Sequence, residues 1–318
     1  MTPAKPDPAA NIAAEVIRTF DALNGSHPGY RPAHAKGILL GGRFTPSPQA
    51  AALTRAPHIQ RSSTPVTIRF SDTTGIPAIP DNDPNASPRG IAIRFHLAEH
   101  VHTDIIAHSI DAFPARNVEE FLQLLQAIRD SGPGASKPLP IETYLGTHPA
   151  ALAYVQAPKP VPVSFSKESF FGVNAYRFLA GDGSAKYGRY RIRPDGAGEY
   201  LDAEAAKQQA PNFLFDDIKG RLGRGPVKMR IAVQVAAPGD TVNDSTVSWP
   251  KDRPEVEFGT VELLSVLPDN DAEQQHIIFD PIPRVDGIEP SADPLLEPRA
   301  TIYLMSGRRR RHEVRGEQ

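Results

Sequence analysis

The chain has 318 residues, of which 40% are hydrophobic and 23% are charged, and its formal net charge is −2. This length suits one large domain or two ordinary ones, and the near-neutral charge gives no argument for binding nucleic acid. Because cysteine is absent, disulfides, thiolate metal sites and thiol nucleophiles are excluded. The sequence has no secretory signal and no apolar run of membrane-spanning length, so we expect a cytoplasmic protein with no membrane partner.

The N-terminal part of the chain combines a tail, a helix and a glycine-rich stretch. Residues 1–10 are expected to form a flexible tail, and apolar residues at the spacing of one helix face predict a helix over 11–24. The stretch 30–44 then places His34 between two alanines, with Arg31 three residues before it. A lone histidine is more often structural than catalytic, so this stretch alone leaves the role of His34 open.

Alternating apolar and polar residues predict strands at 64–71 and 90–97, joined by a long polar loop. The first of them places Arg69 and Ser71 on its polar face. Further strands are predicted at 172–179, 186–193, 227–235 and 255–266.

The clearest predicted helix spans 117–129 and carries Phe121 on its apolar face. Residues 136–169 contain six prolines and are expected to form surface loops. Two short helices are expected at 203–208 and 213–221, and a last one at 295–306. With strands in the middle and helices near both ends, the sequence predicts an α+β domain with an antiparallel sheet, either closed or strongly curved.

Arg299 and Tyr303 are four residues apart and therefore lie on one face of the last predicted helix. A guanidinium one turn before a phenol favours the phenolate, which is a hard anionic ligand for ferric iron. The alternative is a tyrosine packed on a core and an arginine in solvent. The arginine run at 308–311 is typical of a solvated tail, although its position directly after this pair keeps an anion-binding role open.

Seven groups of short motifs follow one another along most of the chain. They are RxxHAKG at 31–37 with GxF at 42–44, TPVxxRFS at 64–71, DP at 83–84 with SPRGxAxRF at 87–95, NAYRF at 174–178, YxRYRxRP at 187–194, TxxWP at 246–250 and PSxDPxLxxRxxxY at 290–303. In this order they resemble the haem-containing catalase family, and the short length resembles its small catalase-related peroxidase branch. The resemblance implies one catalase-like domain over 1–318, an antiparallel β-barrel with flanking α-helices that encloses haem b.

The resemblance also implies roles on the distal side of the haem. His34 is the expected base that takes a proton from bound peroxide and returns it to the departing oxygen. Ser71 is expected to orient His34, and Phe121 to stack near the haem. Large catalases have a distal asparagine where this chain, counted without gaps, has His108; a small shift brings Asp111 there instead. Neither residue is an amide, so both stay open as distal catalytic residues.

On the proximal side the resemblance makes Tyr303 the iron ligand and Arg299 the cation that keeps its phenolate ionised. Arg31, Arg69 and Arg310 are the expected partners of the haem propionates, with Arg310 the least certain because it lies within a run of arginines.

The function that this resemblance implies is a haem peroxidase that reduces hydrogen peroxide or organic hydroperoxides with a small organic reductant. The missing amide disfavours efficient dismutation, so only weak catalase activity is expected. Two alternatives stay open: a lipid hydroperoxide isomerase or dehydratase on the same scaffold, and a non-catalytic haem-binding protein. A homo-oligomer is also left open, and the electron donor is not identified.

Overall fold

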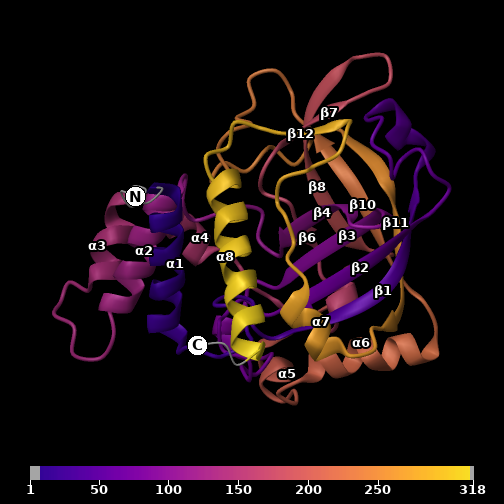
Figure 1. The fold of residues 1–318 in the computed structure, drawn as a ribbon. Coiled ribbons are helices and arrows are strands. Elements are labelled where there is room, and N and C mark those ends of the chain that lie inside the picture. Colours follow the sequence, from indigo (N-terminus) through magenta and orange to yellow (C-terminus); the bar gives the residue numbers. More distant parts are fainter. Residues whose placement is uncertain (1–7, 316–318) are drawn as a thin grey trace, which may run out of the picture.

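The computed structural model describes residues 8–315, in which eight antiparallel strands close into a barrel (Figure 1). In barrel order they are β10 (Val227–Val235), β11 (Glu255–Val266), β1 (Gly37–Pro46), β2 (Thr64–Ser71), β3 (Gly90–Ala98), β4 (Val101–His108), β6 (Phe170–Phe171) and β8 (Ala185–Pro194). Pairing between β8 and β10 closes the ring. The prediction of an α+β fold with an antiparallel barrel is confirmed.

Four short strands lie outside this ring. β7 (Tyr176–Leu179) pairs with β8, and β12 (Ile288–Pro290) pairs with β7. β5 (Val161–Pro162) and β9 (Tyr200–Leu201) form a separate pair.

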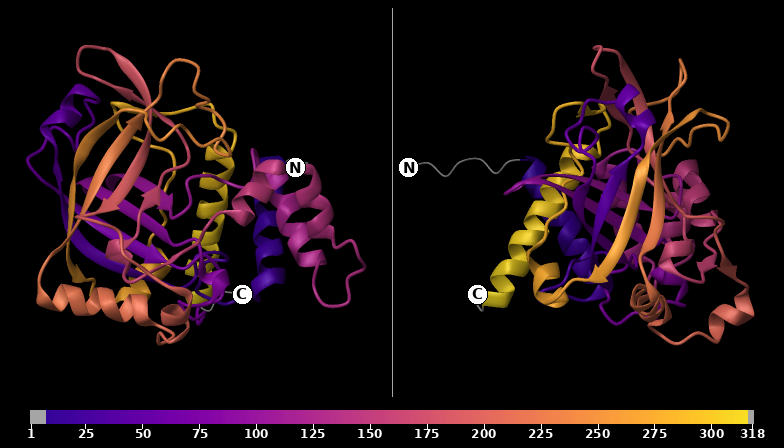
Figure 2. Two further views of the ribbon diagram at one scale, coloured as in Figure 1. Left: turned by 180° about the vertical axis from the view of Figure 1, so that it is seen from behind. Right: turned by 90° about the vertical axis from the view of Figure 1, so that its right-hand side faces the viewer.

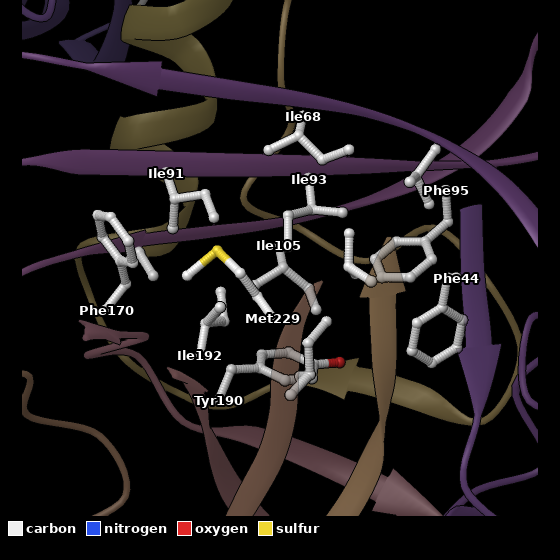
Figure 3. Close-up of a cluster of buried hydrophobic side chains, with 14 of the residues drawn as sticks. Phe44, Ile68, Ile91, Ile93, Phe95, Ile105, Phe170, Tyr190, Ile192 and Met229 are labelled. Carbon is white, nitrogen blue, oxygen red and sulfur yellow. The ribbon is translucent and has the colours of Figure 1, made fainter. Parts of the chain in front are cut away.

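Side chains of the barrel strands alternate between an apolar interior and an outer face. Phe70, Ile91 and Ala107 belong to the buried interior cluster, and Figure 3 shows neighbouring interior side chains from several strands meeting at its centre. Because successive residues of a strand point to opposite faces, Arg69 and Ser71 of β2 lie on the outer face. The same argument places Gly90 of β3 and His108 of β4 on the outer face.

The helices gather on this outer side and at one end of the barrel. They are α1 (Pro8–Asn24), α2 (Val118–Asp130), α3 (Pro140–Thr147), α4 (Pro149–Gln156), α5 (Ala203–Lys207), α6 (Phe213–Arg224), α7 (Asn270–His276) and α8 (Leu296–Arg315), with short 3₁₀ turns η1 (Pro48–Ala52), η2 (Pro84–Ala86) and η3 (Phe165–Lys167). Figures 1 and 2 show α8 between the barrel and the group α1 to α4, and α1 packs on both α2 and α8. None of the helices within residues 8–315 is long and apolar enough to cross a membrane.

Two expectations about loops are wrong. Residues 136–169 contain the helices α3 and α4. Pro140 and Pro149 stand in the first turn of these helices, where a proline leaves no intrahelical hydrogen bond unmade. At the N-terminus, α1 begins at Pro8, inside the expected tail; residues 1–7 of that tail lie outside the described residues.

The boundaries of other elements also differ from the predictions. Only residues 176–179 of the predicted strand 172–179 form a strand, β7, and the two-residue strand β6 ends at Phe171, before the predicted range. Strands β1 and β4 and helix α7 were not predicted as elements. Helix α8 extends to Arg315 and so includes the arginine run. Arg309 pairs with Asp21 of α1 at 2.5 Å, so this part of the run packs on the protein and is not a solvated tail.

Candidate active site

His34 lies in a short segment that is held against the end of β2. Its backbone N–H donates to the carbonyl of Thr73 at 2.9 Å, and that of Ala35 donates to Thr74 at 2.9 Å. The φ of His34 is 55°, a left-handed conformation that is uncommon for residues other than glycine. Nδ1 of His34 lies 3.0 Å from Oγ of Ser71, which fixes the orientation of the ring. The structure thus brings His34 and Ser71 together.

Gly90 provides the space into which the His34 ring fits. A Cβ built on Gly90 would lie 2.6 Å from Oγ of Ser71 and 2.8 Å from Nδ1 of His34. Neither distance is compatible with an ordinary side chain. A glycine is therefore needed at this position for the imidazole to lie flat on the outer face of β3 beside Ser71.

The surroundings of His34 keep its imidazole neutral. Burial first, and then the neighbouring Arg69 and His108, lower its pKa from 6.5 to about 3. A neutral imidazole has a free lone pair and can accept a proton near neutral pH. The ring can therefore act as a general base without first losing a proton.

His108 and Asp111 have different surroundings. His108 is close enough to His34 to lower its pKa, and its own pKa is lowered to about 3 by burial and by Arg299. Asp111 instead forms an ion pair with Arg191 at 3.0 Å. Of the two candidates for the distal position, His108 is the one that lies close enough to His34 to interact with it.

Phe121 reaches this region from α2. Its ring centroid lies 5.1 Å from that of Phe113 and 6.0 Å from that of Phe20. Phe113 in turn lies 6.5 Å from the His108 ring. The aromatic residues thus form an apolar wall that leads from α1 and α2 to His108.

A hydrogen-bonded chain of four side chains fixes Tyr303 on α8. Arg299 donates from Nη2 to the hydroxyl of Tyr303 at 3.1 Å and from Nη1 to Oδ1 of Asn174. Asn174 donates to Asp293 at 2.8 Å. Burial alone lowers the pKa of Arg299, but the net effect of its neighbours, first among them Tyr303, raises it. The guanidinium is therefore fully charged beside the phenol.

Three arginines from distant parts of the chain converge next to this helix. Arg31 and Arg310 both donate to the carbonyl of Ile277 at 3.0 Å, and Arg310 also donates to Ser306 at 2.9 Å. Arg69 donates from Nε to the side chain of Gln274 at 3.0 Å. A Cβ on Gly37 would lie 2.2 Å from the Arg69 guanidinium, so that glycine is needed for its path.

These three arginines repel one another in a buried environment. Burial, together with the charges of Arg69 and Arg310, lowers the pKa of Arg31 well below its ordinary value. Burial and then Arg310 lower the pKa of Arg69 to about 9. Their hydrogen-bond partners among the described residues are carbonyl, amide and hydroxyl oxygens, without a carboxylate. Such a cluster is suited to an anion, because the burial of charged groups is costly unless they are paired.

Several residues of the site had no predicted role. Asn174 and Asp293 occur in the quoted motifs, but the link that they form with Arg299 joins positions more than a hundred residues apart. Gln274 lies on α7, a helix that no pattern in the sequence predicted. Gly90 lies in the motif SPRGxAxRF at 87–95, and its lack of a side chain is the signal that could have drawn attention to this position.

The donor set limits what the site can hold. No group of three or more His, Asp or Glu side chains suited to a metal ion occurs in the part of the chain that the structure describes. A metal here would therefore be held by Tyr303 together with a prosthetic group, and the arginine cluster would bind the acidic substituents of that group.

The chain was compared with known proteins. The model of the family described as Catalase matches residues 15–315. A catalase-related peroxidase of Mycolicibacterium paratuberculosis is 37% identical over 96% of both chains. One of Synechococcus elongatus is 31% identical over 92% of this chain and 86% of its own.

Solved structures show the same fold. Catalase A from Saccharomyces cerevisiae superposes with a TM-score of 0.78 at 20% identity, over 95% of this chain. This chain spans 66% of the length of that solved catalase.

Proposed function

The chain belongs to the catalase family, and from this we propose that it is a haem peroxidase that reduces hydrogen peroxide or organic hydroperoxides with a small organic reductant. The observation that carries the proposal is the pairing, within one buried site, of a neutral base, His34, with a phenol, Tyr303, that is hydrogen-bonded to a charged guanidinium.

The residues fit haem b. The phenol of Tyr303 is a suitable ligand for ferric iron, and Arg299 places a charged guanidinium 3.1 Å from its oxygen. Two propionate groups would supply the carboxylates that Arg31, Arg69 and Arg310 lack. When bound, haem would supply the electrons that reduce the peroxide.

The protein side chains would manage the proton. His34 takes the proton of the hydroperoxide with its free nitrogen while Ser71 holds the other nitrogen in place. It then returns the proton to the departing oxygen, so that water or an alcohol leaves as a neutral molecule. The reductant afterwards restores the two electrons.

The relatives favour this function over the alternatives. Two relatives above 30% identity are named catalase-related peroxidases, which supports peroxide reduction rather than isomerisation of a lipid hydroperoxide or haem binding without catalysis. Neither His108 nor Asp111, the two candidates for the distal position, carries an amide, so we propose that dismutation is weak. A small organic reductant, a homo-oligomer and a cytoplasmic location stay predictions from the sequence, which does not identify the reductant.

One set of assays tests the proposal. Purified protein loaded with haem should oxidise an aromatic donor such as guaiacol only when hydrogen peroxide or cumene hydroperoxide is added, and should release little oxygen. Conversion of a fatty acid hydroperoxide without consumption of donor would favour the isomerase. A haem spectrum without turnover of either kind would favour a binding protein.

A further inference from the structure

A row of residues in register crosses the outer face of the barrel under His34. Ser71 of β2 pairs with Gly90 of β3, and Gly90 pairs with His108 of β4. Directly paired residues project to the same face of a sheet. The next positions along β3 and β4, Ile91 and Ala107, belong to the interior cluster, and Figure 3 shows Ile91 inside the barrel. The three members of the row therefore share the outer face.

The His34 ring lies over the middle of this row. Gly90 has no side chain, and the position that its Cβ would take is 2.9 Å from Cε1 of His34. Ser71 binds the ring from one side at 3.0 Å. His108 is the next residue on the other side, about one strand spacing, ~4.8 Å, beyond Gly90. The imidazoles of His34 and His108 are thus neighbours on one surface.

The hydrogen bond that Nδ1 of His108 accepts determines whether Nε2 of the same ring carries a proton. The backbone N–H of Ile110 donates to Nδ1 of His108 at 3.3 Å, so Nδ1 must carry a lone pair. A neutral imidazole then has its proton on Nε2. Burial keeps the pKa of His108 at about 3, consistent with the neutral ring. Nε2 is buried and has no hydrogen-bond partner among the described residues.

A buried donor without a partner indicates a ligand that is absent from the protein itself. Aromatic rings surround the His108 ring, with Phe113 at 6.5 Å and Tyr154 at 6.4 Å between centroids. They supply no acceptor at Nε2. Asp111, the other candidate, is paired with Arg191, and an ionised carboxylate cannot donate a hydrogen bond.

We propose that Nε2–H of His108 donates a hydrogen bond to the hydroperoxide that His34 deprotonates, so that the donor is a member of the strand row and the base is the imidazole that lies over it. The inference rests on the proposed function and adds a substrate-binding residue to it. As His34 takes the proton, negative charge grows on the peroxide oxygen, and a fixed donor stabilises that charge most when it is fully developed. The imidazole N–H would then be the hydrogen-bond donor, a role that an amide N–H could also fill.

Fluoride binding tests the donor without turnover, because fluoride binds ferric haem and accepts hydrogen bonds from distal donors. The protein loaded with haem is titrated with sodium fluoride and followed by its absorption spectrum, for the wild type and for His108→Leu, His108→Asn and His100→Asn. His100 is an exposed histidine of the β3–β4 turn and serves as the control.

The expected result is a fluoride affinity that falls about tenfold or more in His108→Leu, since a hydrogen bond to a charged group is lost. His108→Asn should stay within about threefold of the wild type because its amide also donates, and His100→Asn should not change. The rate constant for reaction with hydrogen peroxide should follow the same order.

Two results would overturn the inference: wild-type fluoride affinity in His108→Leu, or an equal loss in the leucine and asparagine variants, which would indicate a purely structural role. If the wild type oxidises donors with peroxide, either of these results leaves the proposed function standing. A wild type that takes up haem without any turnover refutes the proposed function and, with it, the substrate named here. Circular dichroism of each variant checks that it is folded.

Discussion

Nη2 of Arg299 lies 3.1 Å from the hydroxyl oxygen of Tyr303, one turn further along α8. The pair is the part of the site in which a charge and its partner are both fixed by the same helix. Since α8 lies between the barrel and the group α1 to α4 (Figure 1), a change in this pair acts in the interior of the molecule.

Replacing the phenol tests the proximal ligand. Tyr303→Phe should fold, but its ferric haem should lose the absorption of a phenolate-ligated iron, and peroxidase turnover should fall at least ~100-fold because the anionic ligand is lost. Tyr200→Phe changes a tyrosine at 42% exposure and should leave both unchanged. A Tyr303→Phe protein with an unaltered spectrum would show that another residue binds the iron.

Asn174 holds Arg299 in place from the side opposite Tyr303. Asn174→Ala should lower the free energy of unfolding by roughly 1–3 kcal/mol, because the buried Arg299 and Asp293 both lose a partner. It should also shift the ferric haem spectrum, because Arg299 becomes free to leave Tyr303. Asn243→Ala, at an exposed position, is the control. If stability falls without a spectral shift, Asn174 has a structural role only.

The low pKa of His34 predicts a flat pH profile. Its neutral form prevails above a pKa of about 3, so the rate constant for reaction with peroxide should not depend on this group between about pH 5 and about pH 8 and should decline only as the pH falls toward about 3. His34→Ala should lower the rate constant about 100- to 10,000-fold, whereas His100→Ala should not. Stopped-flow measurement of this rate constant over the same pH range checks the prediction. A sharp fall in the rate constant between pH 7 and 6 would contradict a buried neutral base.

The arginine cluster predicts how firmly haem is retained. Arg310→Leu should release haem to excess apomyoglobin about tenfold faster or more, since one charged hydrogen-bond partner of a propionate is gone. Arg308 is two residues earlier on α8 and exposed, so Arg308→Leu should release haem at the wild-type rate. If Arg310→Leu and Arg308→Leu release haem at the same rate, the effect comes from the net charge of the arginine run and not from Arg310 in particular.

His58 predicts a pH dependence of stability that has nothing to do with catalysis. It is 1% exposed among the rings of Phe44, Phe95 and Phe258, and burial lowers its pKa from 6.5 to about 3. Between these two values the unfolded chain binds a proton that the folded one does not. Stability is therefore retained above about pH 6.5 and lost as the pH falls toward 3, by about 1.4 kcal/mol per unit.

His58→Leu should remove that contribution. From urea titrations at about pH 7 and about pH 5, the variant should lose ~2 kcal/mol less than the wild type on acidification. His100→Gln, which changes a histidine whose side chain is 93% exposed, should behave like the wild type. An unchanged pH dependence in His58→Leu would mean that His58 is protonated in the folded protein or equally buried in the unfolded one.

Local patterns in the sequence determined the parts of the structure that depend on near neighbours. Alternation gave β2 its exact bounds and placed Arg69 and Ser71 on the face opposite Phe70, because side chains of a strand alternate by geometry. The four-residue spacing of Arg299 and Tyr303 was enough to predict their contact, since a helix brings such positions together. The order of the motifs was enough to predict the family.

Only the tertiary structure decided which residues from distant segments lie beside one another on the barrel. The sequence left His108 and Asp111 as equal candidates, and the register of β3 and β4 separates them: it sets His108 opposite Gly90, while the bend after β4 turns Asp111 to Arg191. Register depends on pairing between distant segments, which no local pattern encodes. For the same reason the prolines of 136–169 suggested loops, although two of them start helices. The burial of Arg310 likewise depends on the packing of α8 against α1 and α7, which no local pattern in the arginine run encodes.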